Sequence, residues 1–431
     1  MAVVTELRCR ACGQRVPAGP VYVCAACFGP LEVVYDGSAW AGLTRAAVEA
    51  RPAGIWRYLE FLPVEAPPAR SLPVGSTPLL AAGPLADEAG LDRLWLKDDT
   101  RNPTLSFKDR VVAVAAARAV AFGFDTLACA STGNLAGAVA AAAAAHGLRG
   151  VVFVPADIEP GKIRQALAFG ATIVPVEGTY DEVNRLCVQV ADEFGWAFAN
   201  VTLRPWYAEG SKTLAFEVAE GLGWRLPDAV VVPVASGSLL TKVAAGFGEL
   251  VRAGLVEERP VRLVGAQPAG CAPVAEAFRS GAERPTPVRR PQTLVRSLAI
   301  GDPADGGEAA RLARETGGSI EAVPDDATVA AIARLATQEG ILVEPAGGCT
   351  LAGALQARAS GVIGPDDETV VLLTGNGIKT PEALAGVLPE GSFGADGIRP
   401  EARVRPSLAA FEAWLDQRAW PAGPVAAAAG E

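Results

Sequence analysis

The sequence predicts an α/β protein with two open parallel sheets, preceded by a small cysteine-rich unit. From Leu94 onwards, apolar runs long enough to be buried strands alternate with helical stretches, which is typical of parallel sheets covered by helices. The chain has 431 residues, half of them apolar, which predicts two or three packed units. The candidate parallel strands are 127–130, 151–154, 172–176, 229–234, 261–266 and 370–373.

The same patterns divide the chain into parts. Residues 1–36 hold two cysteine pairs. Residues 37–125 and 201–420 are expected to form a large α/β domain, into which residues 126–200 insert a small α/β domain of four strands. A helix is expected near 46–61, ahead of a proline-rich link. Residues 421–431 are mostly alanine, glycine and proline, and a disordered tail is expected there.

Composition excludes several classes of protein. The net charge of −10 argues against a nucleic-acid partner and against an anionic membrane surface. The least polar stretch, 126–145, is mostly alanine and is interrupted by polar residues, so it predicts a buried helix and not a membrane span. The first residues show no Lys/Arg-then-apolar pattern, so we expect no signal segment. We therefore expect a cytoplasmic protein that acts on a small molecule.

Two C-x2-C pairs stand near the N-terminus, Cys9 with Cys12 and Cys24 with Cys27. Two such turns can direct four thiolates at one tetrahedral ion, which predicts a zinc ribbon. Four protein ligands leave no open position on the ion, so this zinc would be structural. The alternative is a set of reduced free thiols, because disulfides are rare in cytoplasmic proteins.

The most informative stretch is 102–110, with the sequence NPTLSFKDR. It follows the short apolar run 94–96 and opens a helix over 111–122, with Ser106 as the expected N-cap. Lys108 then lies in the first helical turn, where the helix dipole disfavours a cation and lowers the pKa of an amine. Such a lysine suits nucleophilic catalysis, and the alternative is a surface lysine at a helix start. The single histidine, His146, precedes Gly147 at an expected helix end. With no other imidazole in the chain, we expect neither a Ser-His-Asp triad nor a multi-histidine metal centre.

Three loops that follow predicted strands are rich in small polar residues: 131–134 (STGN), 235–239 (ASGSL) and 374–377 (TGNG). Loops of this composition let backbone amides converge on an anion at a helix N-terminus. None matches the nucleotide-binding patterns G-x-x-x-x-G-K-[ST] or G-x-G-x-x-G. The residues by themselves therefore predict an anionic ligand next to a nucleophilic lysine.

These motifs, together with EGSKT at 209–213, PVASGSLL at 233–240, VEPAGG at 343–348 and LTGNGIK at 373–379, resemble the threonine synthase family of fold-type II pyridoxal-phosphate (PLP) enzymes. The resemblance runs from about Gly75 to Leu388. An N-terminal zinc ribbon also occurs in some members. The resemblance implies two open parallel-sheet domains, with PLP as the cofactor.

The resemblance also implies roles for single residues. Lys108 would join the cofactor aldehyde and later carry protons, Asn134 would meet the phenolic oxygen, and Thr374 would meet the pyridine nitrogen. The residues that would hold the cofactor phosphate are Ala235, Ser236, Gly237, Ser238 and Leu239. The residues that would hold the α-carboxylate of the substrate are Ser131, Thr132 and Gly133.

The implied reaction converts O-phospho-L-homoserine and water to L-threonine and phosphate, and a homodimer is implied with it. Arg204 and Lys212, near the Glu209 motif, are the candidates for binding the leaving phosphate. Three alternatives stay open: an enzyme acting on phosphoserine in the manner of cysteate synthase, a serine or threonine dehydratase, and a non-enzymatic zinc-ribbon binding module.

Overall fold

The computed structural model describes residues 3–131, 133–158, 160–178, 180–384, 393–394, 397–398 and 403–417. The chain divides into two compact units, Met1–Ala385 and Gly386–Glu431. The second unit contains the antiparallel pair β14 (Phe393–Gly394) and β15 (Gly397–Ile398), and the helix α15 (Leu408–Asp416). The predicted disordered tail, 421–431, lies outside the described residues.

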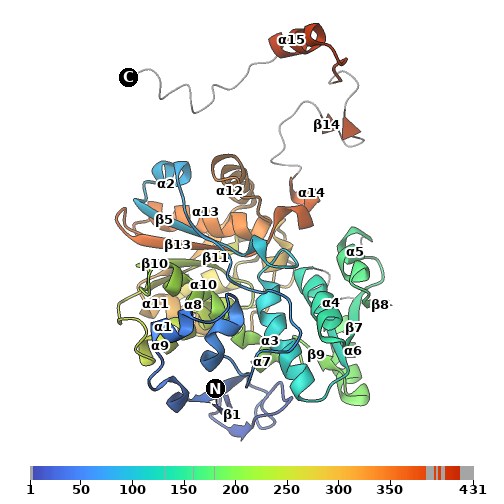
Figure 1. Ribbon diagram of the computed structural model, residues 1–431, viewed down its shortest axis with the longest axis vertical. Helices are drawn as coiled ribbons and strands as arrows, with labels where there is room; N and C mark the ends of the chain where they lie inside the picture. The colour runs from blue at the N-terminus through green and yellow to red at the C-terminus, as the bar shows by residue number, and fades with distance from the viewer. Residues whose placement is uncertain are drawn as a thin grey trace. The chain divides into compact units, whose positions relative to one another are not determined.

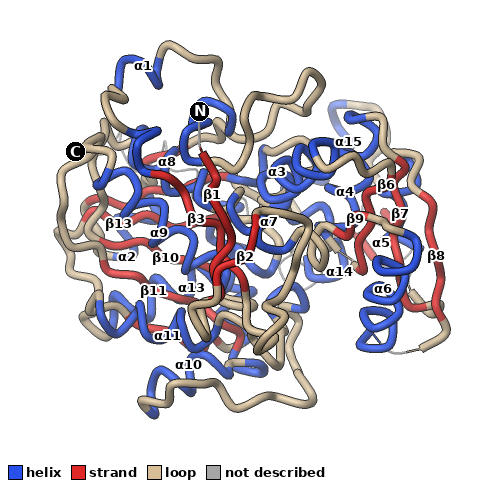
Figure 2. The backbone as a smooth tube through the Cα atoms, turned by 90° about the horizontal axis from the view of Figure 1, so that it is seen from below, coloured by secondary structure: helices blue, strands red, loops and turns tan. Residues whose placement is uncertain are grey.

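The first unit begins with a small antiparallel sheet in the order β2-β1-β3 (Figures 1 and 2). Its strands are β1 (Val3–Cys9), β2 (Arg15–Pro17) and β3 (Leu31–Asp36). Burial alternates along β3, where Leu31 and Val33 are buried and the residues between them are less so, as expected for a strand with one face packed on a core. We call residues 3–36 the ribbon.

The prediction of one helix near 46–61 is wrong, because two separate helical segments occupy this stretch. After the 3-10 turn η1 (Gly37–Trp40), α1 covers only Arg45–Glu49, and the 3-10 segment η2 covers Ile55–Phe61. Between them stand Pro52, which cannot donate to a helix, and Gly54 at φ 123°. The break lets η2 pack on α8 (Lys212–Gly221) through the tilted ring pairs of Phe216 with Tyr58 and Phe61.

The large sheet has six strands in the order β12-β11-β10-β13-β5-β4. They are β4 (Leu79–Ala81), β5 (Arg93–Asp98), β10 (Ala229–Pro233), β11 (Arg262–Pro268), β12 (Ser319–Val323) and β13 (Glu368–Leu373). All neighbours are parallel except β4 with β5. The two central strands, β10 and β13, are buried along their whole length, which explains the apolar runs 229–233 and 370–373.

A second parallel sheet has the order β8-β7-β6-β9. Its strands are β6 (Thr126–Ala130), β7 (Arg149–Pro155), β8 (Thr172–Val176) and β9 (Ala197–Phe198), and its helices are α4 (Asn134–His146), α5 (Pro160–Ala168) and α6 (Tyr180–Phe194). These elements form the green part of Figure 1. Two parallel sheets confirm the predicted α/β class, whereas the domain boundaries stay a prediction.

The remaining helices cover the large sheet or join the two sheets. They are α2 (Pro84–Ala89), α3 (Lys108–Ala121), α7 (Arg204–Glu209), α8 (Lys212–Gly221), α9 (Ser238–Arg252), α10 (Pro273–Ser280), α11 (Gly306–Glu315), α12 (Asp325–Gln338), α13 (Pro345–Ala359) and α14 (Pro381–Leu384). Helix α3 packs against both α4 and α7 and is buried on nearly every side, as its alanine- and valine-rich sequence predicts. Among the described residues no helix is long and apolar enough to cross a membrane.

Candidate active site

Three of the predicted functional stretches meet at one edge of the large sheet. Strands β10, β13 and β5 are parallel neighbours, so the residues that follow Pro233, Leu373 and Asp98 all leave the sheet at the same edge. Ligands of open α/β sheets bind at this carboxyl edge. The segments that follow the strands lead to α9, to the 374–377 loop and to Lys108.

The segment before Lys108 is joined to the 374–377 loop by backbone hydrogen bonds. Phe107 N donates to Thr374 O at 2.8 Å, and Asn376 N donates to Leu105 O at 3.0 Å. Ser106 forms an isolated bridge with Gly375, and its buried hydroxyl has no hydrogen-bond partner among the described residues. The prediction that Ser106 caps α3 is therefore wrong, because its backbone is held by the facing loop and the cap position falls to Phe107.

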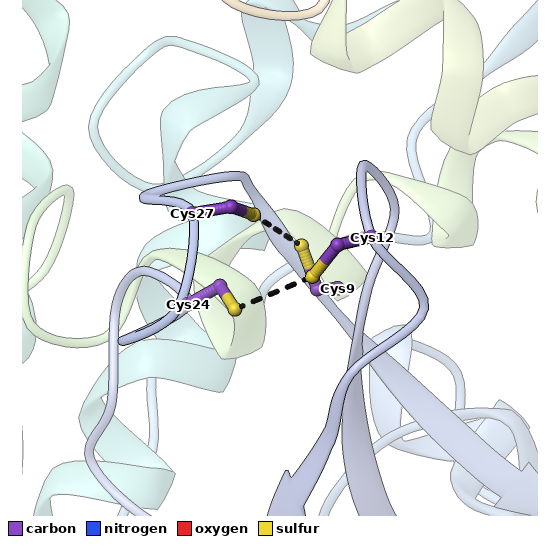
Figure 3. A group of neighbouring side chains, drawn as sticks. All are labelled: Cys9, Cys12, Cys24 and Cys27. Carbon is purple, nitrogen blue, oxygen red and sulfur yellow. Dashed lines mark hydrogen bonds between the residues drawn. The ribbon is translucent and has the colours of Figure 1, made fainter.

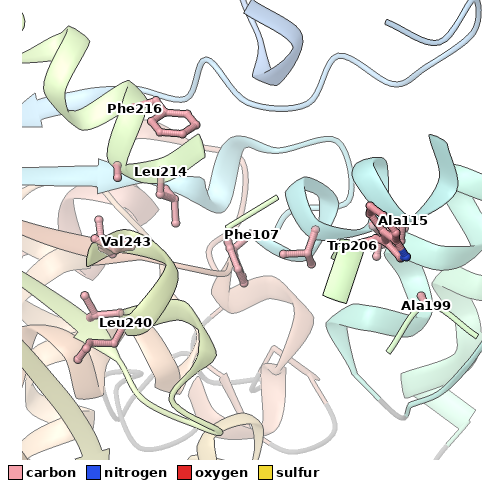
Figure 4. Packing of buried hydrophobic residues seen from close by; sticks show 14 of the residues in the cluster. Phe107, Ala115, Ala199, Trp206, Leu214, Phe216, Leu240 and Val243 are labelled. Carbon is pink, nitrogen blue, oxygen red and sulfur yellow. The ribbon is translucent and has the colours of Figure 1, made fainter. Parts of the chain in front are cut away.

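Lys108 is the first residue of α3, as predicted. Its side chain is half-buried, and its Nζ lies 5.3 Å from the centre of the Phe107 ring and 5.9 Å from that of Tyr207. Within the described part of the chain no carboxylate lies at ion-pair distance from this amine. Phe107 also belongs to the buried cluster that contains Leu240 and Val243 of α9 (Figure 4). The amine thus lies near two aromatic rings at the start of α3.

A buried ion-pair cluster fixes the start of α3. Arg110 is fully buried and forms two hydrogen bonds with Asp99, at 2.7 and 2.8 Å, and two with Glu217, at 2.7 and 2.8 Å. Lys97 Nζ lies 2.6 Å from Glu217 Oε2. Burial alone would raise the pKa of Glu217, but the charges of Arg110 and Lys97 hold it well below its usual value. The cluster ties α3 to β5 and α8, and so positions Lys108 two residues away.

Glu344, at the N-cap of α13, links the two sheets beside this site. Its side chain is 4% exposed and accepts a hydrogen bond from Asn134 Nδ2 at 2.8 Å. Burial raises the pKa of Glu344, while the Asn134 hydrogen bond and the charges of Lys379 and Lys108 oppose the rise. A Cβ on Gly375 would lie 2.3 Å from Glu344 Cδ, so a larger residue there would displace the Glu344 carboxylate. The sequence placed Glu344 inside a motif but gave it no role.

The 235–239 loop has the backbone of an anion site. Gly237 adopts φ 93°, and a Cβ there would lie 2.5 Å from Asp305 O. Ser238 begins the 15-residue helix α9, whose first N–H groups have no partner inside the helix. These amides and the helix dipole favour an anion at this end. Ala235 and Leu239 flank the turn, and both are partly exposed.

The 131–134 loop leaves the edge of the small sheet and enters α4. Ser131 N donates to Phe153 O at 3.2 Å, and Gly133 N donates to Ser131 Oγ at 3.2 Å. Thr132 lies outside the described residues. Since Asn134 reaches Glu344, this loop lies on the same side of the molecule as the 374–377 loop.

Arg204 and Lys212 differ in their placement. Arg204 begins α7, one turn before Tyr207, and its Nη2 lies 3.5 Å from Asp305 Oδ2. Lys212 is fully buried, with its Nζ 2.6 Å from Glu209 and 3.0 Å from Glu249. A lysine with two buried carboxylate partners does not face a ligand, so the structure does not agree with the expected phosphate contact of Lys212. The sequence could not show which face of α8 is covered.

The four N-terminal cysteines come together at the end of the ribbon (Figure 3). Their Sγ atoms all lie within 4.8 Å of one another. Cys9 Sγ is 3.5 Å from Cys27 Sγ, and Cys12 Sγ is 3.7 Å from Cys24 Sγ. Four ligands around a tetrahedral zinc at the usual Zn–S distance would be separated by about 3.8 Å. The spacing of the sulfurs is therefore compatible with a bound metal ion.

Comparison with known proteins agrees with this geometry. A protein-family model described as "Pyridoxal-phosphate dependent enzyme" matches residues 70–375, and a second, described as "NinF protein", matches residues 8–32. The maize serine racemase structure superposes with a TM-score of 0.60 at 19% identity, covering 72% of this chain and 90% of that one. The structure of processed threonine deaminase isoform 2 from Solanum lycopersicum gives a TM-score of 0.62 at 21% identity, covering 78% and 90%. Fold and site thus define a pyridoxal-phosphate-dependent enzyme.

Relatives in sequence narrow this class. The threonine synthase of Methanocaldococcus jannaschii is 36% identical over 379 residues, which cover 87% of this chain and 93% of the relative. The threonine synthase of Methanosarcina acetivorans is 35% identical over 387 residues, which cover 89% and 95%. The chain belongs to the threonine synthase family.

Proposed function

We propose that this chain uses PLP to convert O-phospho-L-homoserine and water to L-threonine and phosphate. The observation that carries the proposal is the position of Lys108. Its amine has no ion-pair partner among the described residues, and it stands at the same sheet edge as the 235–239 and 374–377 loops. This edge offers a nucleophile and an anion site together, in a chain 36% identical to a threonine synthase.

The residues at this edge fit PLP. Lys108 would hold the cofactor through its aldehyde. The amides of Ala235, Gly237 and Leu239 and the hydroxyls of Ser236 and Ser238 would hold its phosphate at the start of α9. Asn134 would face its phenolic oxygen, and Thr374 its pyridine nitrogen. When bound, PLP supplies an aldehyde for the substrate amine and a ring that withdraws electrons from the neighbouring carbon.

Lys108 would then act as the proton carrier. It removes protons from Cα and Cβ of the substrate and returns protons to Cγ and Cα. The Cγ–O bond breaks, and phosphate leaves with the electron pair. Water adds its hydroxyl to Cβ, and the remaining proton of water leaves with the phosphate. The hydroxyl of Thr374, in contrast to a carboxylate, would leave the pyridine nitrogen neutral, which favours elimination and replacement over transamination.

The substrate would be held at its two acidic ends. Ser131, Thr132 and Gly133 would bind the α-carboxylate at the start of α4. Arg204 would bind the phosphate, since it lies one helical turn from Tyr207, whose ring is 5.9 Å from Lys108 Nζ. Lys212 would serve indirectly, by holding Glu209 in place.

The proposal includes a structural zinc on Cys9, Cys12, Cys24 and Cys27, supported by the sulfur spacing. It also includes a homodimer, which sedimentation of the purified protein tests. The absence of a nucleic-acid partner stays a prediction from the net charge of −10, and a cytoplasmic location stays a prediction from the sequence patterns. The zinc content of the purified protein, measured per chain, tests the proposed zinc site.

Release of phosphate from three substrates tests the reaction. The PLP-loaded protein is given O-phospho-L-homoserine, O-phospho-L-serine or L-serine, and the amino-acid product is identified. We expect equal amounts of phosphate and threonine from the first compound alone. Turnover of phosphoserine in its place would favour a cysteate synthase-like enzyme, and deamination of serine in its place would favour a dehydratase. Protein that binds no PLP would favour the non-enzymatic module.

A further inference from the structure

The ribbon touches the large sheet's ligand edge through an arginine that lies between two cysteines. Arg10 stands in the turn that joins Cys9 to Cys12, and its Nη2 forms an ion pair with Asp305 Oδ1. The Asp305 side chain is only 6% exposed, so this contact is shielded from solvent. The pair connects residues 295 positions apart in the chain.

The position of Arg10 depends on both cysteine turns. Arg10 N donates to Pro30 O at 3.0 Å, which ties the first turn to the end of the second. Within the turns, Gly13 N donates to Cys9 O at 2.9 Å and Phe28 N donates to Cys24 O at 2.8 Å. Figure 3 shows the cysteines of the two turns facing one another. An ion bound by all four sulfurs would therefore also fix the backbone that carries Arg10.

Asp305 in turn supports the 235–239 loop. Asp305 N donates to Ser236 O at 2.8 Å. Gly237 approaches so closely that a Cβ there would lie 2.5 Å from Asp305 O and 3.1 Å from Gly306 N. Two residues of the loop thus rest on Asp305, and a shift of Asp305 would move the amides at the start of α9.

A second contact leads from the ribbon to the same helix. Tyr35 of β3 donates its hydroxyl to Glu209 Oε2 at 2.6 Å, and Lys242 of α9 forms an ion pair with Glu209 Oε1. Lys242 lies one turn after Ser238, the first residue of α9. Glu209 is 1% exposed, so the link is buried. The ribbon therefore reaches α9 along two routes, one through Asp305 and one through Glu209.

We propose that the metal-closed ribbon is a brace for the loop that holds the cofactor phosphate, and that Arg10 and Asp305 are the positioning residues that connect them. The cysteines take no part in the chemistry; they determine how tightly PLP is bound. This inference rests on the proposed role of residues 235–239 as the phosphate loop.

The PLP dissociation constant of the full chain, measured by absorbance titration, tests the brace. Arg10→Met and Asp305→Asn should each raise it about threefold to tenfold, the range of a partly shielded ion pair. Asp305→Asn also loses the ion pair with Arg204. The double variant should therefore bind PLP no more weakly than Asp305→Asn alone, because Arg10→Met removes a contact that Asp305→Asn already lacks. Arg8→Met is the matched control, since Arg8 lies two residues earlier, in β1, and among the described residues it pairs with Glu32 alone, with half of its side chain exposed. It should bind PLP as the wild type does.

Removal of zinc with a chelator is a second test of the brace. It should raise the PLP dissociation constant of the wild type and add little to that of Arg10→Met, because this variant has already lost the contact with Asp305. The phosphorus NMR resonance of bound PLP should shift in Arg10→Met and stay in place in Arg8→Met. A role of Arg10 in general stability alone would not move this resonance.

The outcomes separate the brace from the function it rests on. Ser238→Ala changes the loop directly and should weaken PLP binding. If Ser238→Ala weakens binding while Arg10→Met and Asp305→Asn, both carrying zinc, bind PLP as the wild type does, the brace is overturned and the phosphate loop stands. If Ser238→Ala also has no effect, the loop assignment fails, and the brace fails with it.

Discussion

Arg110→Met should destabilise the protein because it leaves two buried carboxylates without their main partner. Arg110 donates two hydrogen bonds to each of Asp99 and Glu217 and is fully buried. Glu217 keeps Lys97, at 2.6 Å, whereas the one side-chain partner left to Asp99 in the described part of the chain is the hydroxyl of Thr77. Removing one partner of a buried ion pair costs about 3–5 kcal/mol.

The expected shift in melting temperature follows from the size of the folding unit. The unit that contains Arg110 spans residues 1–385. At about 2.1 cal/mol/K per residue, its unfolding entropy is about 0.8 kcal/mol/K. A loss of about 3–5 kcal/mol therefore lowers the melting temperature by about 4–6 °C.

Thermal melting of purified variants tests this reasoning. The control is Arg311→Met, because Arg311 pairs with Glu308 and Glu315 on the surface of α11 and its side chain is 48% exposed. Surface pairs contribute about 1 kcal/mol or less, so the control should melt within about 1 °C of the wild type. Adding Asp99→Asn to Arg110→Met should recover part of the loss. The reasoning is refuted if Arg110→Met melts at the same temperature as the control. It is also refuted if the melting temperature of the double variant falls by the sum of the two single decreases.

Three further predictions concern the site and the ribbon. Gly375→Ala would place a methyl group about 2.3 Å from Glu344 Cδ, and should weaken PLP binding in a titration more than tenfold; unchanged affinity would contradict the site geometry. Burial raises the pKa of Asp109 from 3.8 to about 6, so between these values the folded state binds more protons than the unfolded state. This contribution to stability is present at low pH and falls by about 3 kcal/mol as pH rises through the window. Asp109→Asn should therefore gain stability over the wild type at pH 7.5 but not at pH 4, and a constant difference in melting temperature would refute this. Cys24→Ser should lose bound zinc, whereas Cys271→Ser, a buried thiol outside the ribbon, should keep it.

The parallel strands were predictable because their sequences report burial directly. The prediction of 229–234 agrees with β10 at 229–233, where every residue is buried and every side chain is apolar. Strand β12, with the sequence SIEAV, was not predicted, since its serine and glutamate break the apolar run and two of its residues are only partly buried. The sequence therefore showed strands that contain an apolar run, including the partly exposed edge strand β8 at 172–176, and missed β12, which has none.

The site was predictable only in part, because its contacts join distant residues. Lys108 could be found from a local signal, the lysine at a helix start. Glu344 could not be assigned a role, because its partner Asn134 lies 210 positions away and only folding brings them together. Lys212 was expected near a ligand because of its motif, whereas its burial between Glu209 and Glu249 depends on how α8 packs against α9.

The most direct test of the central claim is to locate the cofactor on the chain. Borohydride reduction of the PLP-loaded protein fixes the cofactor to the lysine that carries it, and mass spectrometry of the digested protein identifies that lysine. The account predicts the cofactor mass on Lys108. Its appearance on any of the other five lysines, or on no lysine, would contradict the account.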